Sequence, residues 1–127
     1  MSQSQVLAAV SIGGAVGALG RWGLSEAIPH SGTAFPWATF TTNVVGCLLM
    51  GILMGLTVRR PLVRPFLGTG VLGGFTTFST FALETRDLAA GDAWATAAGY
   101  VVASVVVGLV AVQVGLATSI RLRRDAA

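Results

Sequence analysis

The chain has 127 residues, of which 54% are hydrophobic and only 10% are charged. Soluble domains carry about 25% charged residues, so lipid is the expected solvent of this chain. The net charge of +3 comes from arginines that flank apolar segments, which is typical of membrane topology signals and not of a nucleic-acid-binding face. The sequence contains no nucleophile–base pair or metal-ligand cluster, which argues against an enzyme, and its single Cys47 has no partner for an internal disulfide.

The first predicted membrane span covers residues 5–27. Gly13 and Gly17 form a G-x-x-x-G pair, which predicts close packing against another helix. Arg21 lies late in the span, where a charge costs much less than at the bilayer centre. The residues leave two interpretations of Arg21 open: it snorkels to the interface beside Trp22, or it concentrates anions at the mouth of a vestibule.

The second predicted span covers residues 36–58. Thr39, Asn43 and Gly46 share one helical face because of their i, i+4, i+7 spacing. An asparagine in mid-span must find a hydrogen-bond partner, because an unpaired amide in hydrocarbon is costly. Asn43 therefore bonds to another helix, with the third span as a candidate, or offers an amide N–H to an anion path. Both roles are compatible.

The third predicted span, residues 62–90, contains the most unusual stretch of the chain, GGFTTFSTF at residues 73–81. Adjacent glycines and β-branched threonines lower helix propensity, so we expect a break near residues 73–77, with half-helices at about 62–72 and 77–90. Broken backbone at membrane depth is tolerated only inside protein or beside a watery cavity. Carbonyls that end the first half would favour a cation, and N–H groups that begin the second would favour an anion. This stretch therefore predicts an ion site.

Aromatic and acidic side chains follow the predicted break. Phe78 and Phe81 share a face of the second half-helix; such a pair is usually core packing, but the positive edges of phenyl rings can also contact an anion. Glu84 lies on the same side. Its partner remains open: it pairs with Arg86, pairs with Arg21, or is protonated.

The fourth predicted span covers residues 94–119. Small and polar residues follow one another at i+3 or i+4 steps along one face: Tyr100, Ser104, Gly108, Ala111 and Gly115. Such a stripe in a helix otherwise rich in Val, Leu and Ala predicts a packing seam. The four spans together predict an all-α, multi-pass membrane protein, with residues 1–127 forming a single transmembrane domain.

The run GGFTTFSTF resembles the signature of the CrcB/Fluc fluoride channels, and GRW at residues 20–22, Asn43 with Gly46, and Tyr100 with Ser104 also match. The resemblance implies an antiparallel dual-topology dimer with two fluoride pores and a structural sodium ion at its centre. It assigns Arg21 to a vestibule. The resemblance also implies a set of pore residues, in which Ser79 and Thr80 supply hydroxyls beside the break. The expected pore residues are Thr39, Asn43, Phe78, Ser79, Thr80, Phe81, Tyr100 and Ser104.

A dimer also has a rationale in the residues. Four helices are too few to enclose a pore and also shield a broken helix from lipid, whereas a second subunit would cover the break. Under two-fold symmetry, the backbone carbonyls of Gly73 and Thr76 from both chains could converge on one cation. Hard oxygen ligands agree with an alkali ion, and the resemblance implies that this ion is sodium.

Arginines are distributed unevenly between the two ends of the spans. The end with both termini carries Arg59, Arg60, Arg64, Arg121, Arg123 and Arg124, whereas the other end carries Arg86 and Arg21. This imbalance predicts one fixed orientation with cytoplasmic termini, whereas a dual-topology homodimer is expected to have nearly balanced charge. A homodimer and a pair with an oppositely oriented homologue are therefore both expectations.

By resemblance, the expected function is a passive fluoride-selective channel in the inner (plasma) membrane, which exports cytoplasmic fluoride and protects the cell from it. The alternative is a small four-span proton-coupled exporter of the multidrug type. Such an exporter needs a membrane-embedded carboxylate, for which Glu26 and Glu84 are the candidates. A third possibility, a non-transporting assembly subunit, would need neither a mid-span asparagine nor a threonine-rich break.

Overall fold

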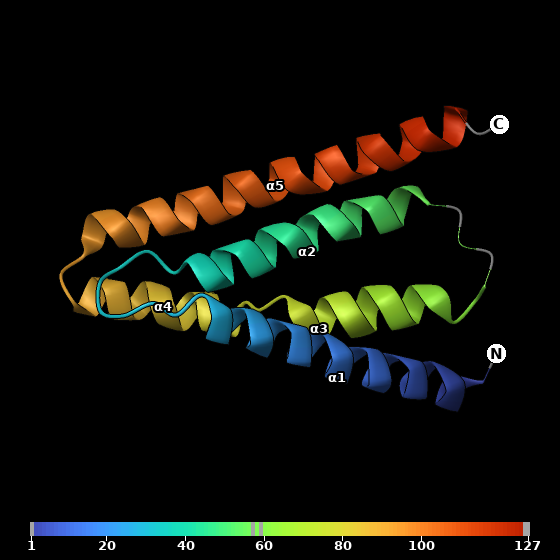
Figure 1. The fold of residues 1–127 in the computed structure, drawn as a ribbon, viewed down its shortest axis with the longest axis horizontal. Helices are drawn as coiled ribbons and strands as arrows, with labels where there is room; N and C mark the ends of the chain where they lie inside the picture. Colours follow the sequence, from blue (N-terminus) through green and yellow to red (C-terminus); the bar gives the residue numbers. More distant parts are fainter. Residues whose placement is uncertain (1, 57, 59, 126–127) are drawn as a thin grey trace.

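The structure, a computed structural model, describes residues 2–56, 58 and 60–125, and helices joined by short connections are the regular secondary structure of that range (Figure 1). Its elements are α1 (Gln3–Ala27), α2 (Trp37–Gly55), the π-helix η1 (Pro65–Leu72), α3 (Gly73–Phe75), α4 (Ser79–Ala90) and α5 (Trp94–Asp125). Four helices are long and apolar enough to cross a membrane when η1, α3 and α4 are taken as one span, Pro65–Ala90. The predicted all-α class with four spans is therefore confirmed.

Capping interactions fix the ends of α1 and α2. Ser2 and Gln5 form a capping box at the start of α1, each side chain bonding to the other residue's backbone amide. At the end of α2, the guanidinium of Arg64 donates to the carbonyl of Leu56 at 3.2 Å, and that of Arg123 donates to the carbonyl of Gly55, also at 3.2 Å. Positive charge at a helix C-terminus is favourable, so these arginines stabilise the end of α2.

Close backbone contacts through glycine organise the helices into two pairs. The helix α1 packs mainly on η1 and α3, and α2 packs mainly on α5 (Figure 1). A Cβ atom on Gly17 would lie only 2.7 Å from the Phe75 amide nitrogen, and one on Gly115 would lie 3.0 Å from the Ile52 amide nitrogen. The predicted helix contact at Gly13 and Gly17 and the predicted seam on α5 are both confirmed.

The third span is interrupted slightly later than the glycine pair suggests. Helical structure ends at Phe75 and resumes at Ser79, and Thr76 has extended backbone (φ −75°, ψ 156°). Gly73 and Gly74 are themselves helical. The absence of a side chain at residue 74 serves packing, because a Cβ atom there would lie 3.0 Å from the Cα atom of Gly14. The break expected near residues 73–77 is therefore found at residues 76–78.

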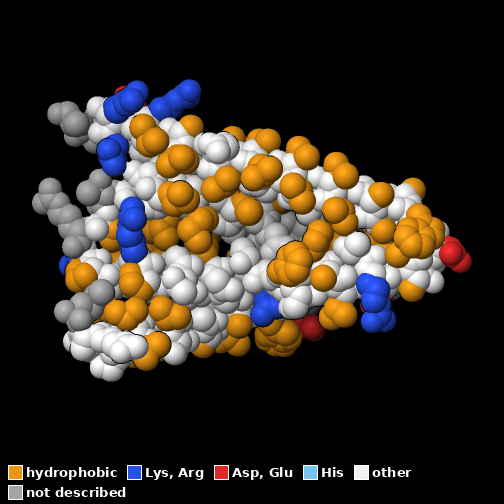
Figure 2. Space-filling model, turned by 180° about the vertical axis from the view of Figure 1, so that it is seen from behind, with side chains coloured by type: hydrophobic (Ala, Val, Ile, Leu, Met, Phe, Trp, Pro, Cys, Tyr) orange, Lys and Arg blue, Asp and Glu red, His pale blue; other side chains and the backbone are white. Residues whose placement is uncertain are grey.

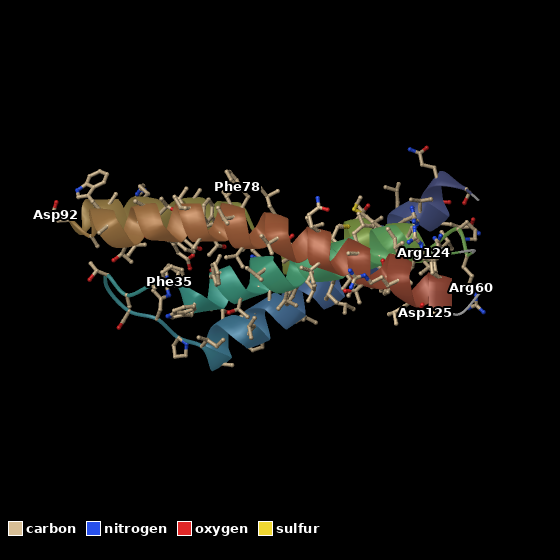
Figure 3. All side chains as sticks on the ribbon, turned by 90° about the horizontal axis from the view of Figure 1, so that it is seen from above. Phe35, Arg60, Phe78, Asp92, Arg124 and Asp125 are labelled. Carbon is tan, nitrogen blue, oxygen red and sulfur yellow. The ribbon has the colours of Figure 1, made fainter. Side chains whose placement is uncertain are left out.

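The two ends of the molecule differ in charge. Both termini and the connection from α2 to η1 lie at the same end (Figure 1). Most arginine side chains gather there in the space-filling view (Figure 2), and Arg60 and Arg124 mark this end in Figure 3, opposite Asp92. Arg59, which belongs to the predicted group, lies outside the described residues. The orientation in the membrane stays a prediction.

Candidate ion site

Asn43 of α2 holds the interruption of the third span. Its Nδ2 donates to the carbonyl oxygen of Thr77 at 2.9 Å, and its Oδ1 accepts from the amide of Thr77 at 2.8 Å. In a continuous α-helix, the Thr77 amide would instead donate to the carbonyl of Gly73. Asn43 therefore satisfies two backbone groups that the broken helix does not pair. The predicted bond from Asn43 to the third span is confirmed.

The side chain of Thr77 organises the first turn of α4. Its Oγ1 accepts from the Thr80 amide at 3.1 Å and donates to Thr80 Oγ1 at 3.0 Å. Accepting from an amide of the first turn is how a capping threonine acts, since those amides lack helical partners. The Thr80 amide is the group that would bond to the Thr76 carbonyl in a continuous helix. The carbonyls of Gly73 and Thr76 have thus both lost their usual helical donors.

A hollow of about 420 Å³ opens beside the interruption. Among the residues that line it are six of the predicted site residues: Asn43, Gly73, Thr76, Phe78, Phe81 and Ser104. The Oγ atom of Ser104 is buried and has no hydrogen-bond partner among the described residues. Because a buried hydroxyl without a partner is costly, this wall has hydrogen-bonding capacity to offer a ligand.

A chain of aromatic rings leads from this hollow into the protein. Ring centroids are 5.9 Å apart for Phe78 and Phe81, and 5.1 Å apart for Phe81 and Tyr100. Phe78 is 80% exposed and points away from the helices (Figure 3), whereas Tyr100 is fully buried. Phe35, from the loop before α2, packs its ring against Tyr100 at 5.3 Å. Phe35 could not be predicted from the sequence pattern, because only the fold brings this loop onto α5.

Glu84 binds hydroxyl groups and not arginine. Thr39 Oγ1 donates to its Oε1 at 2.8 Å, and the Tyr100 hydroxyl donates to its Oε2 at 2.7 Å. Arg86 pairs with its neighbour Asp87 at 3.3 Å on the surface. Of the pairings left open from the sequence, both arginine partners are therefore wrong, and the carboxylate connects α2, α4 and α5.

Arg21 lies at a second hollow of about 280 Å³. Its Nε donates to the carbonyl of Gly74 at 3.2 Å, which attaches α1 to the end of the first half of the third span. Thr39 and Thr80 also line this hollow. The guanidinium has further N–H donors beyond Nε, so Arg21 places positive charge beside these hydroxyls.

Most of the predicted site residues line one of the two hollows, Ser79 and Tyr100 line neither, and Thr77 lines both. Tyr100 lies beneath Phe81 and connects the aromatic rings to Glu84. Ser79 is exposed, and its hydroxyl lies 3.3 Å from Thr77 Oγ1. The role of the Thr77 hydroxyl could not be predicted from the sequence, because its hydrogen bonds depend on where the helix restarts.

The chain matches the family model described as "CrcB-like protein, Camphor Resistance (CrcB)" over residues 8–116. The chain belongs to the CrcB family. The match extends over the interruption of the third span and both hollows. Together with the four apolar helices, membership of the CrcB family makes the chain a multi-pass membrane protein.

Curated CrcB relatives resemble the chain over most of its length. It is 46% identical over 115 residues to "Fluoride-specific ion channel FluC 1" of Streptomyces coelicolor, covering 87% of this chain and 75% of that protein. It is 47% identical over 113 residues to "Fluoride-specific ion channel FluC" of Opitutus terrae, covering 84% and 86%. It is 46% identical over 124 residues to "Fluoride-specific ion channel FluC 1" of Mycobacterium bovis, covering 93% and 94%.

Proposed function

We propose that this chain is a passive fluoride-selective channel of the plasma membrane, through which cytoplasmic fluoride leaves the cell down its gradient. The observation that carries the proposal is its 46% identity, over 115 residues, to a protein named a fluoride-specific ion channel. The hollow beside the interrupted span supports it, because hydroxyl, amide and ring-edge groups meet there without a full positive charge among the residues that line it. Such a wall can replace the water around a small anion without trapping the ion.

The anion path that we propose runs along the first hollow. Ser104 offers a hydroxyl with no partner among the described residues. An amide nitrogen carries two N–H donors, and Asn43 uses one of them on Thr77, which leaves the second for an anion. Phe78 and Phe81 add the positive edges of their rings. Thr80 lines the second hollow and Ser79 is exposed beside Thr77, so their hydroxyls would extend the polar side of the path beyond the first hollow.

Thr39 and Tyr100 would act on the anion through Glu84. Both of their hydroxyl protons point to its carboxylate oxygens, at 2.8 and 2.7 Å. An anion near these hydroxyls would compete with Glu84 for the same protons. Arg21, beside the second hollow, would raise the local anion concentration as a vestibule residue.

The proposed functional unit is an antiparallel dimer with the interruption at mid-membrane. Residues 76–78 lie near the middle of the 26-residue span Pro65–Ala90, and non-helical backbone at that depth must be shielded from lipid. The exposed Phe78 ring and the open hollow fit a second subunit that covers this face. The second subunit is either another copy of the chain or an oppositely oriented homologue. Because the arginines are unevenly distributed between the two ends, both subunits need to be tested.

A sodium ion at the dimer centre would bind backbone carbonyls of Gly73 and Thr76. The residues fit such an ion, since both carbonyls have lost their usual helical donors and both residues line the same hollow. Oxygen atoms are the ligands that hard cations prefer. Bound sodium would supply positive charge between the two subunits and hold the two interruptions together.

Fluoride efflux from liposomes that contain the purified chain alone tests the proposal, with chloride as the control anion. Fluoride release without chloride release, and without a proton gradient, is expected. Efflux that requires a proton gradient would point to the proton-coupled exporter. If a folded protein gives no efflux, adding an oppositely oriented homologue separates a missing partner, which restores flux, from a wrong assignment, which does not.

A further inference from the structure

The hydroxyl of Thr77 has a role that the proposed ion path does not use. We infer that Thr77 is a positioning residue: its hydroxyl keeps the third span from closing into a continuous helix, so that the carbonyls of Gly73 and Thr76 stay available to a cation. The inference deepens the proposed function, because it rests on the proposed sodium site. It concerns the Thr77 side chain, whereas Asn43 binds only the Thr77 backbone.

Hydrogen bonds on both sides of the interruption support this role. Upstream, the Thr77 amide is turned away from the Gly73 carbonyl and bonds to Asn43 at 2.8 Å. Downstream, Thr77 Oγ1 accepts a hydrogen bond from the Thr80 amide at 3.1 Å. Without that hydroxyl, the acceptor that helix geometry offers to the Thr80 amide is the Thr76 carbonyl. Forming that bond would extend α4 into the interruption and remove one of the two proposed cation ligands.

The location of Thr77 makes the effect specific. Thr77 lines both hollows, so it is adjacent to the site residues of each. The extended backbone of Thr76, with ψ at 156°, directs the chain out of the first half-helix immediately before Thr77. A shift of α4 toward a continuous helix would therefore change both hollows and move Phe78.

Two substitutions separate the hydroxyl from the shape of the side chain. Thr77→Val keeps the volume and the β-branching, which favours extended backbone, but removes the acceptor. Thr77→Ser keeps the acceptor and removes the methyl group. Thr118→Val is the matched control, because its exposed hydroxyl donates to a carbonyl of its own helix, that of Val114, at 2.8 Å.

The experiment measures two properties of each variant in liposomes: hydrogen exchange of the Thr80 amide, and the sodium concentration that gives half-maximal fluoride efflux. For Thr77→Val we expect the half-maximal sodium concentration to rise about tenfold, because one proposed cation ligand is removed, and the exchange rate of the Thr80 amide to change by a similar factor as its acceptor changes from Thr77 Oγ1 to the Thr76 carbonyl. A tenfold effect corresponds to a helix cap of ordinary strength. Thr77→Ser keeps the capping hydroxyl, and Thr118→Val removes a hydroxyl that caps no helix end. Both variants should therefore stay within about twofold of wild type.

Thr77→Val with wild-type amide exchange and wild-type sodium requirement would overturn the inference. If the wild-type chain releases no fluoride, the proposed function fails, while the exchange measurement still decides the role of Thr77. If fluoride release needs no sodium, the sodium site fails, and amide exchange again decides: a change confined to Thr77→Val supports the positioning role, and no change refutes it.

Discussion

Replacing Asn43 by leucine should lower the free energy of unfolding, because it removes hydrogen bonds and not apolar contacts. The leucine keeps the volume but removes both bonds to Thr77, at 2.9 and 2.8 Å. Hydrogen bonds between membrane helices contribute roughly 0.6–2 kcal/mol each. The Thr77 amide and carbonyl would also lose their partners, and a buried backbone group without one costs about 1–3 kcal/mol. Since these two terms partly describe the same loss, we expect a decrease of about 2–4 kcal/mol in the free energy of unfolding.

The assay is unfolding of the purified protein in mixed detergent micelles by increasing SDS, followed by tryptophan fluorescence. One fixed protein concentration is used, because the stability of the proposed dimer would depend on concentration. Gln113→Leu is the matched control, since it removes an amide from an exposed position on α5. A loss below about 1 kcal/mol for Asn43→Leu, or one equal to that of Gln113→Leu, would refute the view that Asn43 holds the interruption.

Three further substitutions test other parts of the structure. Gly17→Val should cost about 3 kcal/mol or more in SDS unfolding by forcing α1 off the Val71 carbonyl and the Phe75 amide, whereas Gly23→Val, with nothing within 4 Å of its Cβ position, should change little. Phe81→Ile should stop fluoride efflux while the proposed dimer still forms on size-exclusion chromatography; unchanged efflux would remove the ring from the proposed path. Tyr100→Phe keeps the ring contacts but removes the donor to Glu84, so it should cost about 1–2 kcal/mol in the same unfolding assay, and no loss would show that this bond contributes nothing.

The spans and their contact faces followed from the sequence because they depend on local pattern. Glycine spacing on α1 and small-residue spacing on α5 define helix faces directly, and those faces are the ones that pack. Composition also predicted that the third span would be interrupted. The exact residues did not follow, because helix propensity at Gly73 and Gly74 is overridden by tertiary packing of the third span against α1.

The partners of polar side chains were the harder part. The sequence offered two arginines, Arg86 and Arg21, as partners of Glu84. In the structure Glu84 instead accepts hydrogen bonds from hydroxyls of α2 and α5. No spacing rule connects those three helices, since their register against one another is set by the packed fold. The cap made by Thr77 and the ring contact of Phe35 were missed for the same reason.

The division of the helices into two pairs has a mechanical consequence. The first half of the third span packs on α1, whereas α4 packs on α5. The helices α1 and α2 contact each other only slightly. Residues 76–78 thus connect the two pairs, and Asn43 of α2 bonds to Thr77 within this connection. Transmembrane helices respond to a change in bilayer thickness by tilting. A tilt of one pair relative to the other would be concentrated at residues 76–78. The geometry of the proposed ion site would then depend on the thickness of the surrounding membrane, because the connection between the two pairs also carries the proposed cation ligand Thr76 and the path residue Phe78.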